Sequence, residues 1–451
     1  MVNSINPYTG KDLYGFPELS EKELKAALQR ADQAFTSWKT RTLQERCSLL
    51  GRAGSVLRSR KKEWAHTITL EMGKPIAQAH AEIEKCAWLC DYYAEEAPGL
   101  LREEHFETDA ARSYVRFDPM GVVLGVMPWN YPFWQVFRFA APALTAGNTA
   151  LLKHASNVWK CGELIENVFR EAGYPEGVFQ FLRIGSGKVG QVLEHPAVRA
   201  VSLTGSTPAG AAVASRAGSL IKKSVLELGG SNALVVFEDA PLEPTLETCI
   251  QARFQNTGQS CIAGKRLLLQ ESIADGFTEE LLKKVGALRS GDPEDPNTYI
   301  GVLAREDLAI DLERQMKDSV ARGARLLCGG RRQGAYFEPA VLAGVKPGMP
   351  AFDEETFGPL LAVCTFKTEE EAVALVNRSD FGLGVSLFTA SPERARRLIP
   401  RLDEGAVFVN ELVKSDPRLP FGGVKLSGYG RELSREGIRE FVNKKTVYVA
   451  R

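Results

Sequence analysis

GVVLGVM, residues 121–127, is the stretch from which the fold of this chain is inferred. It is a short apolar run rich in β-branched residues, and Pro128 ends it at once, so it predicts a buried β-strand. Four similar runs follow: TALLK (149–153), VFQFLRI (178–184), AVSLTG (200–205) and SVLEL (224–228). Helix-length segments, Asn157–Glu171 and Thr207–Ala217, separate some of them. This alternation predicts βαβ units on a parallel, doubly wound sheet, and hence an α/β fold.

A second series of apolar runs begins at residue 232. Its members are NALVVF (232–237), RLLLQ (266–270), LLAVCTF (360–366), VSLFT (385–389) and GAVFVN (405–410). A chain of 451 residues is too long for one compact core, so we expect two α/β domains in tandem. The chain before both series reads as helical from Ser20 to about Glu95, with a capping box at Ser20 and Glu23. RSYVRFDPMG (112–121) and TVYVAR (446–451) are expected to be edge strands that leave the main body.

The overall charge argues against several classes of partner. Lys and Arg together number 56, as do Asp and Glu, so no global field attracts nucleic acid, an anionic membrane or a polyacidic protein.

The eight cysteines are too sparse for a disulfide framework and favour a reducing compartment. No signal peptide and no membrane-spanning run is evident, so a cytoplasmic protein is expected.

Two glycine-rich loops could hold a phosphate group. GSGKVG (185–190) has the G-x-G-x-x-G pattern after a predicted strand, although an ordinary glycine turn explains it equally well. TGSTPAG (204–210) also follows a strand and opens a helix, whose N-terminus attracts anions. Either loop alone indicates only a phosphorylated ligand.

Cys261 lies in FQNTGQSCIAG (254–264), a polar, glycine-flanked stretch between two apolar segments. Most free cysteines are buried and inert. A polar loop, however, makes a poor core element and suits backbone amides that face an oxyanion, so Cys261 is a candidate nucleophile. Cys86 and Cys90 are one helical turn apart, but no histidine lies near them in the sequence, so no metal site is expected.

A cysteine nucleophile usually has a base. None of the five histidines has a neighbourhood that nominates it. Glu227, at the end of an apolar strand and followed by two glycines, is a costly residue to place there without a use. The alternative, a strand-end glutamate that reaches solvent or pairs with Lys222, is favoured from this residue alone.

Seven motifs together resemble one family. They are PWNYP (128–132), LLK ending at Lys153, LTGST (203–207), LELGG (226–230), GQSC ending at Cys261, EETFGP (354–359) and PFGGVKLSGYGRE (420–432). Their order and approximate spacing are those of the NAD(P)-dependent aldehyde dehydrogenase superfamily, and the resemblance runs from INPYTG near residue 5 to the C-terminal strand. The chain is identified as a member of that superfamily.

The resemblance implies a mechanism. Cys261 would attack an aldehyde to give a thiohemiacetal, whose oxyanion the Asn130 side chain and the Cys261 amide would hold. Hydride would pass to the nicotinamide, and Glu227 would activate the water that hydrolyses the thioester. Relatives that transfer the acyl group to coenzyme A typically lack this glutamate, so a free carboxylic acid is the expected product.

The resemblance also implies a cofactor site, NADP, NAD or both. Its residues would be Trp129 and Lys153 at the adenosine half, Gly205 and Ser206 at the pyrophosphate, Leu228 at the nicotinamide, and Glu355 with Phe357 at the nicotinamide ribose. NAD-selective members usually carry KPxE where this chain has KHAS, ending at Ser156. A hydroxyl in place of that carboxylate removes the repulsion of a 2′-phosphate, so we expect NADP to be accepted.

The expected substrate is succinate semialdehyde, because the chain most resembles a bacterial succinate semialdehyde dehydrogenase subgroup. Arg138, eight residues after Asn130, would bind the substrate carboxylate, although a helix-face arginine paired with a carboxylate is as good an interpretation. Gln255 stands where many of these enzymes have a second arginine. Ser415 would add a donor, and Trp134 would narrow the channel.

The family's architecture implies a cofactor-binding domain (1–105 and 121–228), a catalytic domain (229–425) and an arm for oligomerisation (106–120 and 426–451). A homodimer or homotetramer is expected. Three alternatives stay open: another short-chain aldehyde or semialdehyde as substrate, a thioesterase or esterase that needs no cofactor, and a binding protein without catalysis.

Overall fold

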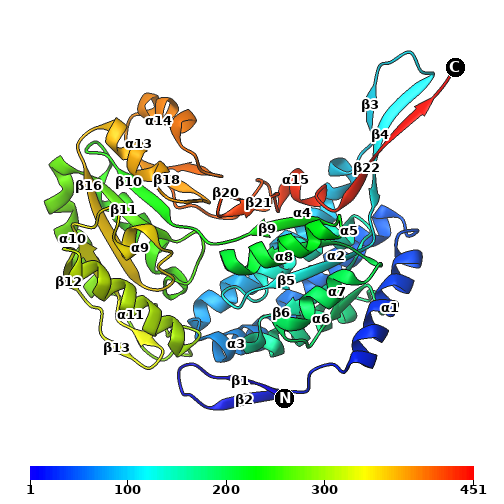
Figure 1. Ribbon diagram of the computed structural model, residues 1–451, viewed down its shortest axis with the longest axis horizontal. Coiled ribbons are helices and arrows are strands. Elements are labelled where there is room, and N and C mark those ends of the chain that lie inside the picture. Colours follow the sequence, from blue (N-terminus) through cyan, green and yellow to red (C-terminus); the bar gives the residue numbers. More distant parts are fainter.

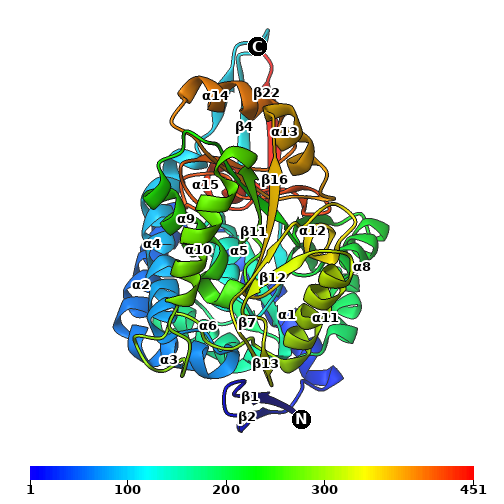
Figure 2. The ribbon, with the colours of Figure 1, turned by 90° about the vertical axis from the view of Figure 1, so that its left-hand side faces the viewer.

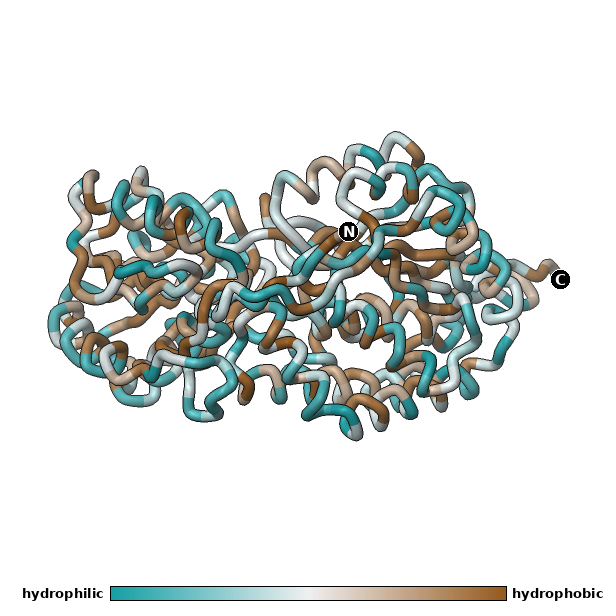
Figure 3. Tube along the Cα trace, turned by 90° about the horizontal axis from the view of Figure 1, so that it is seen from below, coloured by the Kyte–Doolittle hydropathy of each residue, from teal (hydrophilic) through white to brown (hydrophobic).

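The computed structural model describes residues 1–451 and has an α/β fold with two large sheets and a small projecting one (Figure 1). Apolar segments run through the middle of both lobes, and hydrophilic stretches are frequent on the outside (Figure 3). No helix is long and apolar enough to cross a membrane. The fold class predicted from the sequence is confirmed.

The first large sheet has six strands in the order β21-β9-β8-β5-β6-β7. Its members are β5 (Val122–Met127), β6 (Thr149–His154), β7 (Phe179–Phe181), β8 (Val198–Thr204), β9 (Lys223–Glu227) and the short β21 (Gly428–Tyr429). All pairings are parallel except that of β21 with β9. The chain runs from β5 outward through β6 and β7, then returns to β8 on the other side of β5. Doubly wound sheets bind their ligands in the crevice at the point where the strand order reverses in this way.

All five apolar runs predicted in this region form strands, but VFQFLRI contributes only Phe179–Phe181. After Phe181 the chain turns toward the segment that precedes the first helix, where the Arg183 carbonyl accepts a hydrogen bond from the Leu19 amide at 2.9 Å. Local hydrophobicity therefore predicts where the strand lies, but its end is set by the hydrogen bond between Arg183 and Leu19, which are far apart in the sequence.

Helices cover both faces of this sheet (Figures 1 and 2). They are α1 (Glu21–Trp38), α2 (Leu43–Ser59), α3 (Lys61–Met72), α4 (Ile76–Leu100), α5 (Trp134–Thr145), α6 (Trp159–Glu171), α7 (Val189–Glu194) and α8 (Thr207–Ser219). The predicted capping box of Ser20 and Glu23 is present at the start of α1. Every residue of α5 is buried, because this helix lies between the sheet and helices α2 and α4. Its polar side chains must therefore find partners inside the protein.

The second large sheet has seven strands in the order β12-β15-β16-β11-β10-β18-β19. Its members are β10 (Asn232–Val236), β11 (Gly264–Gln270), β12 (Arg325–Cys328), β15 (Ala340–Ala343), β16 (Leu360–Phe366), β18 (Val385–Phe388) and β19 (Val407–Val409). Its main helices are α9 (Leu242–Phe254), α10 (Ala274–Gly286), α11 (Glu306–Ala321), α12 (Pro350–Asp353), α13 (Glu369–Asn377) and α14 (Pro392–Leu398). The second predicted series is confirmed, and β12 and β15 extend the sheet beyond it.

The small sheet projects from the body (Figure 1). Strand β4 (Arg112–Pro119) pairs along its whole length with the antiparallel β22 (Val442–Val449), and β3 (Glu104–Phe106) lies on its other side. The two predicted edge strands therefore pair with each other. Helix α15 (Ser434–Ile438) packs on α4 and α5, so between residues 426 and 451 only β22 belongs to the projecting sheet. An N-terminal hairpin, β1 (Val2–Ile5) with β2 (Asp12–Phe16), was not expected.

Candidate active site

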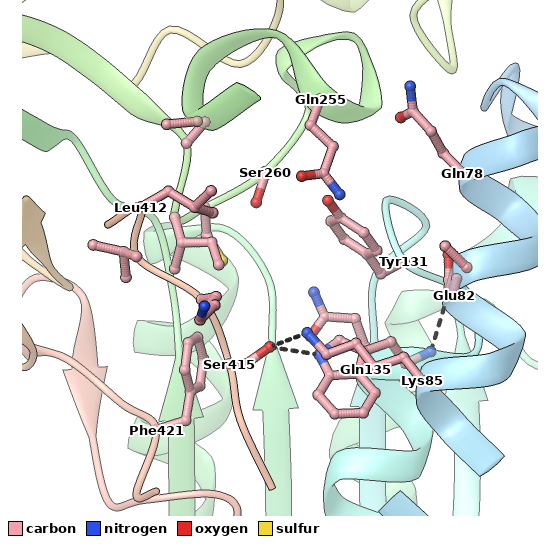
Figure 4. Close-up of a pocket in the computed structure, with 18 of the residues that line it drawn as sticks. Gln78, Glu82, Lys85, Tyr131, Gln135, Gln255, Ser260, Leu412, Ser415 and Phe421 are labelled. Carbon is pink, nitrogen blue, oxygen red and sulfur yellow. Dashed lines mark hydrogen bonds between the residues drawn. The ribbon is translucent and has the colours of Figure 1, made fainter. Parts of the chain in front are cut away.

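A cavity of about 140 Å³ contains the predicted nucleophile. Its walls come from α4, from Tyr131 and α5, from the end of α9, from the loop that carries Cys261, and from residues 412–421 (Figure 4). Parts of the chain that lie more than 300 residues apart in sequence thus share one small site. Its volume is below the usual range for ligand sites, about 300–1,000 Å³, so it suits a small substrate.

The loop before Cys261 has a strained backbone. Asn256 and Thr257 have left-handed conformations, with φ of 56° and 55°, and Gly258 follows at 71°. A positive φ at a β-branched threonine is costly and persists only when the surroundings enforce it. They do so here, because the Thr257 hydroxyl accepts from the Gly301 amide at 3.0 Å. A Cβ on Gly258 would lie 2.4 Å from the Gly358 carbonyl oxygen, so only glycine fits.

Cys261 itself is half-buried. Burial raises the pKa of its thiol to about 11, while the positive charges of Arg138 and Lys265 act in the opposite direction. The backbone amide of Cys261 donates no hydrogen bond within the protein, so it is free to face an oxyanion. The resting thiol is protonated at neutral pH, and attack requires a group that removes this proton.

Lys265 is a functional candidate that the sequence analysis missed. Its ammonium is buried and donates to the carbonyl oxygens of Ser260 and Cys261, both at 2.8 Å, and it pairs with Glu355 at 3.2 Å. Lys265 thus fixes the nucleophile loop from behind and links it to a predicted cofactor residue. Burying a charged lysine at the start of an apolar strand costs free energy, as does burying Glu227 at the end of one. Lys265 could therefore have been recognised as a candidate from the sequence.

Glu227 lies in a buried cluster with two further charges. Arg138 Nε is 2.7 Å from Glu432 Oε2, whereas neither carboxyl oxygen of Glu227 has a hydrogen-bond partner. One guanidinium cannot neutralise two buried carboxylates. Burial, and next the charge of Glu432, raise the pKa of Glu227 well above its ordinary value. The positive charges of Arg138 and Arg431 act in the opposite direction.

Asn130 lies behind the cavity wall and does not line it. Its Nδ2 donates to the Gln259 carbonyl at 3.2 Å, and its Oδ1 accepts from Gln135 at 3.3 Å. A side-chain amide has two N–H groups, so one stays available for an oxyanion. Asn256 strengthens this link through bonds from Nδ2 to the carbonyls of Asn130 and Gln259, both at 2.9 Å.

The structure brings the four predicted substrate residues together. Trp134, Arg138, Gln255 and Ser415 all line the cavity that contains Cys261. Gln255 has a side-chain amide that no hydrogen bond within the protein engages, and Trp134 Nε1 donates to Ser415 Oγ at 3.0 Å. Arg138, in contrast, is already paired with Glu432 and also donates to Gln135 and Thr204. Arg138 therefore lines the substrate cavity, as the first interpretation requires, and is paired with a carboxylate, as the second requires.

A larger cavity, of about 1,070 Å³, lies between the N-terminal hairpin and the second lobe. Ser156 lines it, and the neighbouring Asn157 has a buried Nδ2 atom without a partner. On β6, burial lowers the pKa of Lys153, which has no carboxylate partner. An unpartnered donor at this cavity and an unpaired cation three residues before Ser156 in the sequence fit a phosphate-bearing nucleotide.

The remaining predicted cofactor residues lie between the two lobes. The rings of Trp129 and Phe357 meet edge to face, with centroids 5.7 Å apart. Glu355 accepts from the Gly230 amide at 3.0 Å, and the side chain of Leu228 covers Gly210 in the first turn of α8.

The loop 204–210 precedes α8, and Ser206 is the N-cap residue of this helix. The Gly205 amide donates to the Glu227 carbonyl at 3.0 Å, so a pyrophosphate there would have to use Ser206 and the following amides. The other loop, 185–190, forms a short turn at the edge strand, where Lys188 donates to the Leu19 carbonyl and pairs with Glu21. An ordinary structural turn accounts for these contacts.

The chain is similar to known proteins over nearly its whole length. The family model described as the aldehyde dehydrogenase family matches residues 1–447. A probable NADP⁺-dependent succinate-semialdehyde dehydrogenase of Synechocystis sp. is 48% identical over 100% of both chains. The NAD(P)⁺-dependent succinate semialdehyde dehydrogenase Sad of Escherichia coli is 45% identical over 99% of this chain and 97% of its own.

Solved structures extend the similarity to three dimensions. The succinic semialdehyde dehydrogenase of Streptococcus pyogenes, crystallised with NADP⁺ as the cofactor, superimposes with a TM-score of 0.98. It is 35% identical, and the match covers 100% of each chain.

Proposed function

The chain belongs to the aldehyde dehydrogenase family, and on this basis we propose that it oxidises succinate semialdehyde to succinate with NADP or NAD. The observation that carries the proposal is the cavity of about 140 Å³ that contains both the Cys261 thiol and polar groups suited to a carboxylate. The full-length similarity to succinate semialdehyde dehydrogenases supports the same substrate.

Cys261 is the proposed nucleophile. Its sulfur, once deprotonated, adds to the aldehyde carbon, and the new oxyanion receives hydrogen bonds from the Cys261 amide and the free N–H of Asn130. The left-handed turn at residues 256–258 precedes Cys261, and the Asn256 side chain donates to the Asn130 carbonyl, so this loop connects the segments that carry the two proposed donors. A bound nicotinamide cofactor supplies the acceptor for the hydride that leaves the thiohemiacetal.

Glu227 is the proposed base for the second half-reaction. The thioester on Cys261 must react with water, and a carboxylate in this buried position takes the proton from that water. Burial raises the pKa of Glu227, and a higher pKa makes its carboxylate a stronger base for this step. Hydrolysis rather than acyl transfer then gives the free acid.

Lys153 and Ser156 are proposed to hold the adenosine end of the cofactor. The cation without a partner and the hydroxyl in place of a carboxylate favour a 2′-phosphate. We expect activity with NADP, with or without NAD. A preference for NAD above about a hundredfold in kcat/KM, roughly 2.7 kcal/mol, would contradict this assignment.

The experiment is a spectrophotometric assay of NADPH and NADH formation with the purified protein. Its panel contains succinate semialdehyde, glutarate semialdehyde, butanal and hexanal, each with both cofactors, and chromatography identifies the product. Succinate semialdehyde should give the highest kcat/KM, and succinate should form without coenzyme A. A higher kcat/KM for butanal would contradict the proposed substrate, and no reduction of either cofactor with any aldehyde would revive the esterase alternative.

The projecting sheet is proposed to pair with another subunit. Phe106, Tyr448 and Val449 are apolar residues about half exposed on it. One edge of this sheet is β22, which is eight residues long and has no strand beyond it. Such an edge is a liability unless another chain covers it. The domain boundaries and the cytoplasmic location expected from the sequence stay predictions. A dimer or tetramer in light scattering, converted to smaller species when residues 442–451 are removed, would support this role for the arm.

A further inference from the structure

We propose that Lys85 of α4, together with Ser415, binds the carboxylate of the substrate. The proposal rests on the proposed function, because it concerns the end of succinate semialdehyde that does not react. It adds a second positive charge, from a lysine, to the arginine expected at position 138.

Lys85 lines the cavity that contains Cys261, and it has no anionic partner. Its Nζ donates to Ser415 Oγ at 2.9 Å and lies 4.3 Å from the centre of the Trp134 ring (Figure 4). An ammonium has three N–H groups, and the single neutral acceptor leaves the charge uncompensated. A partly buried cation of this kind is stabilised by an anion that enters the cavity.

The carboxylates nearest to Lys85 are already engaged. Glu82, one helical turn earlier, pairs with Lys74 and accepts from the amides of Phe133 and Trp134 at 2.9 and 3.0 Å. It thus fixes the start of α5 and has no oxygen left over. Asp416 forms a two-pronged pair with Arg418 at 2.9 and 2.7 Å. The protein itself therefore offers Lys85 no counter-ion.

Ser415 completes the site. Its oxygen accepts from both Lys85 Nζ and Trp134 Nε1, and a hydroxyl has one further hydrogen of its own. That O–H is free to donate, so a carboxylate placed here would receive bonds from Lys85 and from Ser415. Three segments distant in sequence, α4, α5 and the loop at 412–421, thereby meet around one anion-binding position.

Arg138 lines the same cavity and carries a second positive charge. Its Nε lies 2.7 Å from Glu432, so it shares its charge with a buried carboxylate, whereas Lys85 does not. Burial, and next the nearby charge of Arg138, lower the pKa of Lys85 to about 8, while Cys86, Asp416 and Glu82 act in the opposite direction. An incoming carboxylate would stabilise the charged form of Lys85 and offset its repulsion by Arg138.

The test compares Lys85→Met and Lys85→Arg with the wild-type enzyme, using succinate semialdehyde and butanal, which has the same chain length and no carboxylate. Lys61→Met is the matched control, because Lys61 of α3 pairs with Glu84, the neighbour of Lys85 on α4, and does not line the cavity. We expect Lys85→Met to raise KM for succinate semialdehyde roughly 10- to 100-fold, the range for loss of a charge-assisted hydrogen bond. Values for butanal should change less than about threefold, and Lys85→Arg should restore much of the selectivity.

The outcomes separate this proposal from the proposed function. Equal changes for both aldehydes in a Lys85→Met enzyme with a wild-type melting temperature would overturn the role of Lys85 and leave the substrate assignment intact. A wild-type enzyme that does not prefer succinate semialdehyde to butanal would overturn the proposed substrate, and the Lys85 site with it. The KM of Lys61→Met should match the wild type for both aldehydes.

Discussion

Replacing Glu227 by glutamine should separate the two half-reactions. The side chain is buried and makes no hydrogen bond, and burial raises its pKa well above the ordinary value. Glutamine has nearly the same shape, so no ion pair or hydrogen bond is lost. The free energy of unfolding should therefore change by less than about 1 kcal/mol.

The effect on catalysis should be much larger than the effect on stability. A positioned general base contributes about 10²- to 10⁴-fold, which corresponds to roughly 2.7–5.4 kcal/mol in the barrier for hydrolysis. Attack by Cys261 and hydride transfer do not require the base for water, so these steps should keep their rates. In stopped-flow absorbance, each active site should form one NADPH rapidly and then nearly stop. Mass spectrometry of the stalled protein should find one succinyl group on Cys261.

Glu440→Gln is the matched control, because Glu440 raises the pKa of Glu227 by its charge yet pairs with Lys223 at 2.6 Å and lines no part of the cavity. Both phases should persist in that variant. Steady-state turnover of Glu227→Gln at the wild-type rate would refute the role of Glu227 as the hydrolytic base. Loss of the rapid phase as well would show that Glu227 acts before hydride transfer, as the base for the thiol.

Three further expectations follow from the same geometry. Ser156→Glu should lower kcat/KM with NADP at least about tenfold, roughly 1.4 kcal/mol, and spare NAD, because a carboxylate repels the 2′-phosphate; an unchanged cofactor ratio would count against that site. The pKa of Lys85 is about 8, so its charge is present below that pH and lost above it. The ratio of kcat/KM for succinate semialdehyde to that for butanal should therefore fall between pH 7 and 9.5, and a flat ratio would disagree. Gly258→Ala should lower activity and also lower the free energy of unfolding by about 1–3 kcal/mol, because the added Cβ would lie 2.4 Å from a carbonyl oxygen. An unchanged Tm in calorimetry would show that the loop can shift.

Several features of the site were predictable because they depend on local sequence. Apolar runs with β-branched residues formed most strands of both sheets. Cys261 was a candidate nucleophile because of its polar loop, and the structure places it at a cavity. Glu227 could be identified from the sequence because burying a carboxylate at the end of an apolar strand costs free energy wherever that strand lies in the fold. The motifs in register identified the family, and the family match over residues 1–447 confirms it.

Other features depended on which segments meet in space. Lys85 reads as one more polar position on a long helix, and nothing within α4 shows that its neighbour Glu82 is occupied elsewhere. The sequence left open whether Arg138 binds the substrate or pairs with a carboxylate, and only the structure shows Glu432, just before α15, 2.7 Å from it. The amide of Gly205 was expected to be available, but the adjacent strand uses it.

The sequence by itself determined the strand and helix pattern, the family and the identity of the reactive groups, because hydrophobic periodicity and residue chemistry act over short stretches. The charge state and availability of each group were decided only by the tertiary structure. Electrostatic interactions between buried groups depend on distance and on desolvation, and both arise when residues as far apart as 138 and 432 share one interior. For that reason only the structure shows that Lys85 has no counter-ion, because it shows that the nearby carboxylates of Glu82 and Asp416 have other partners.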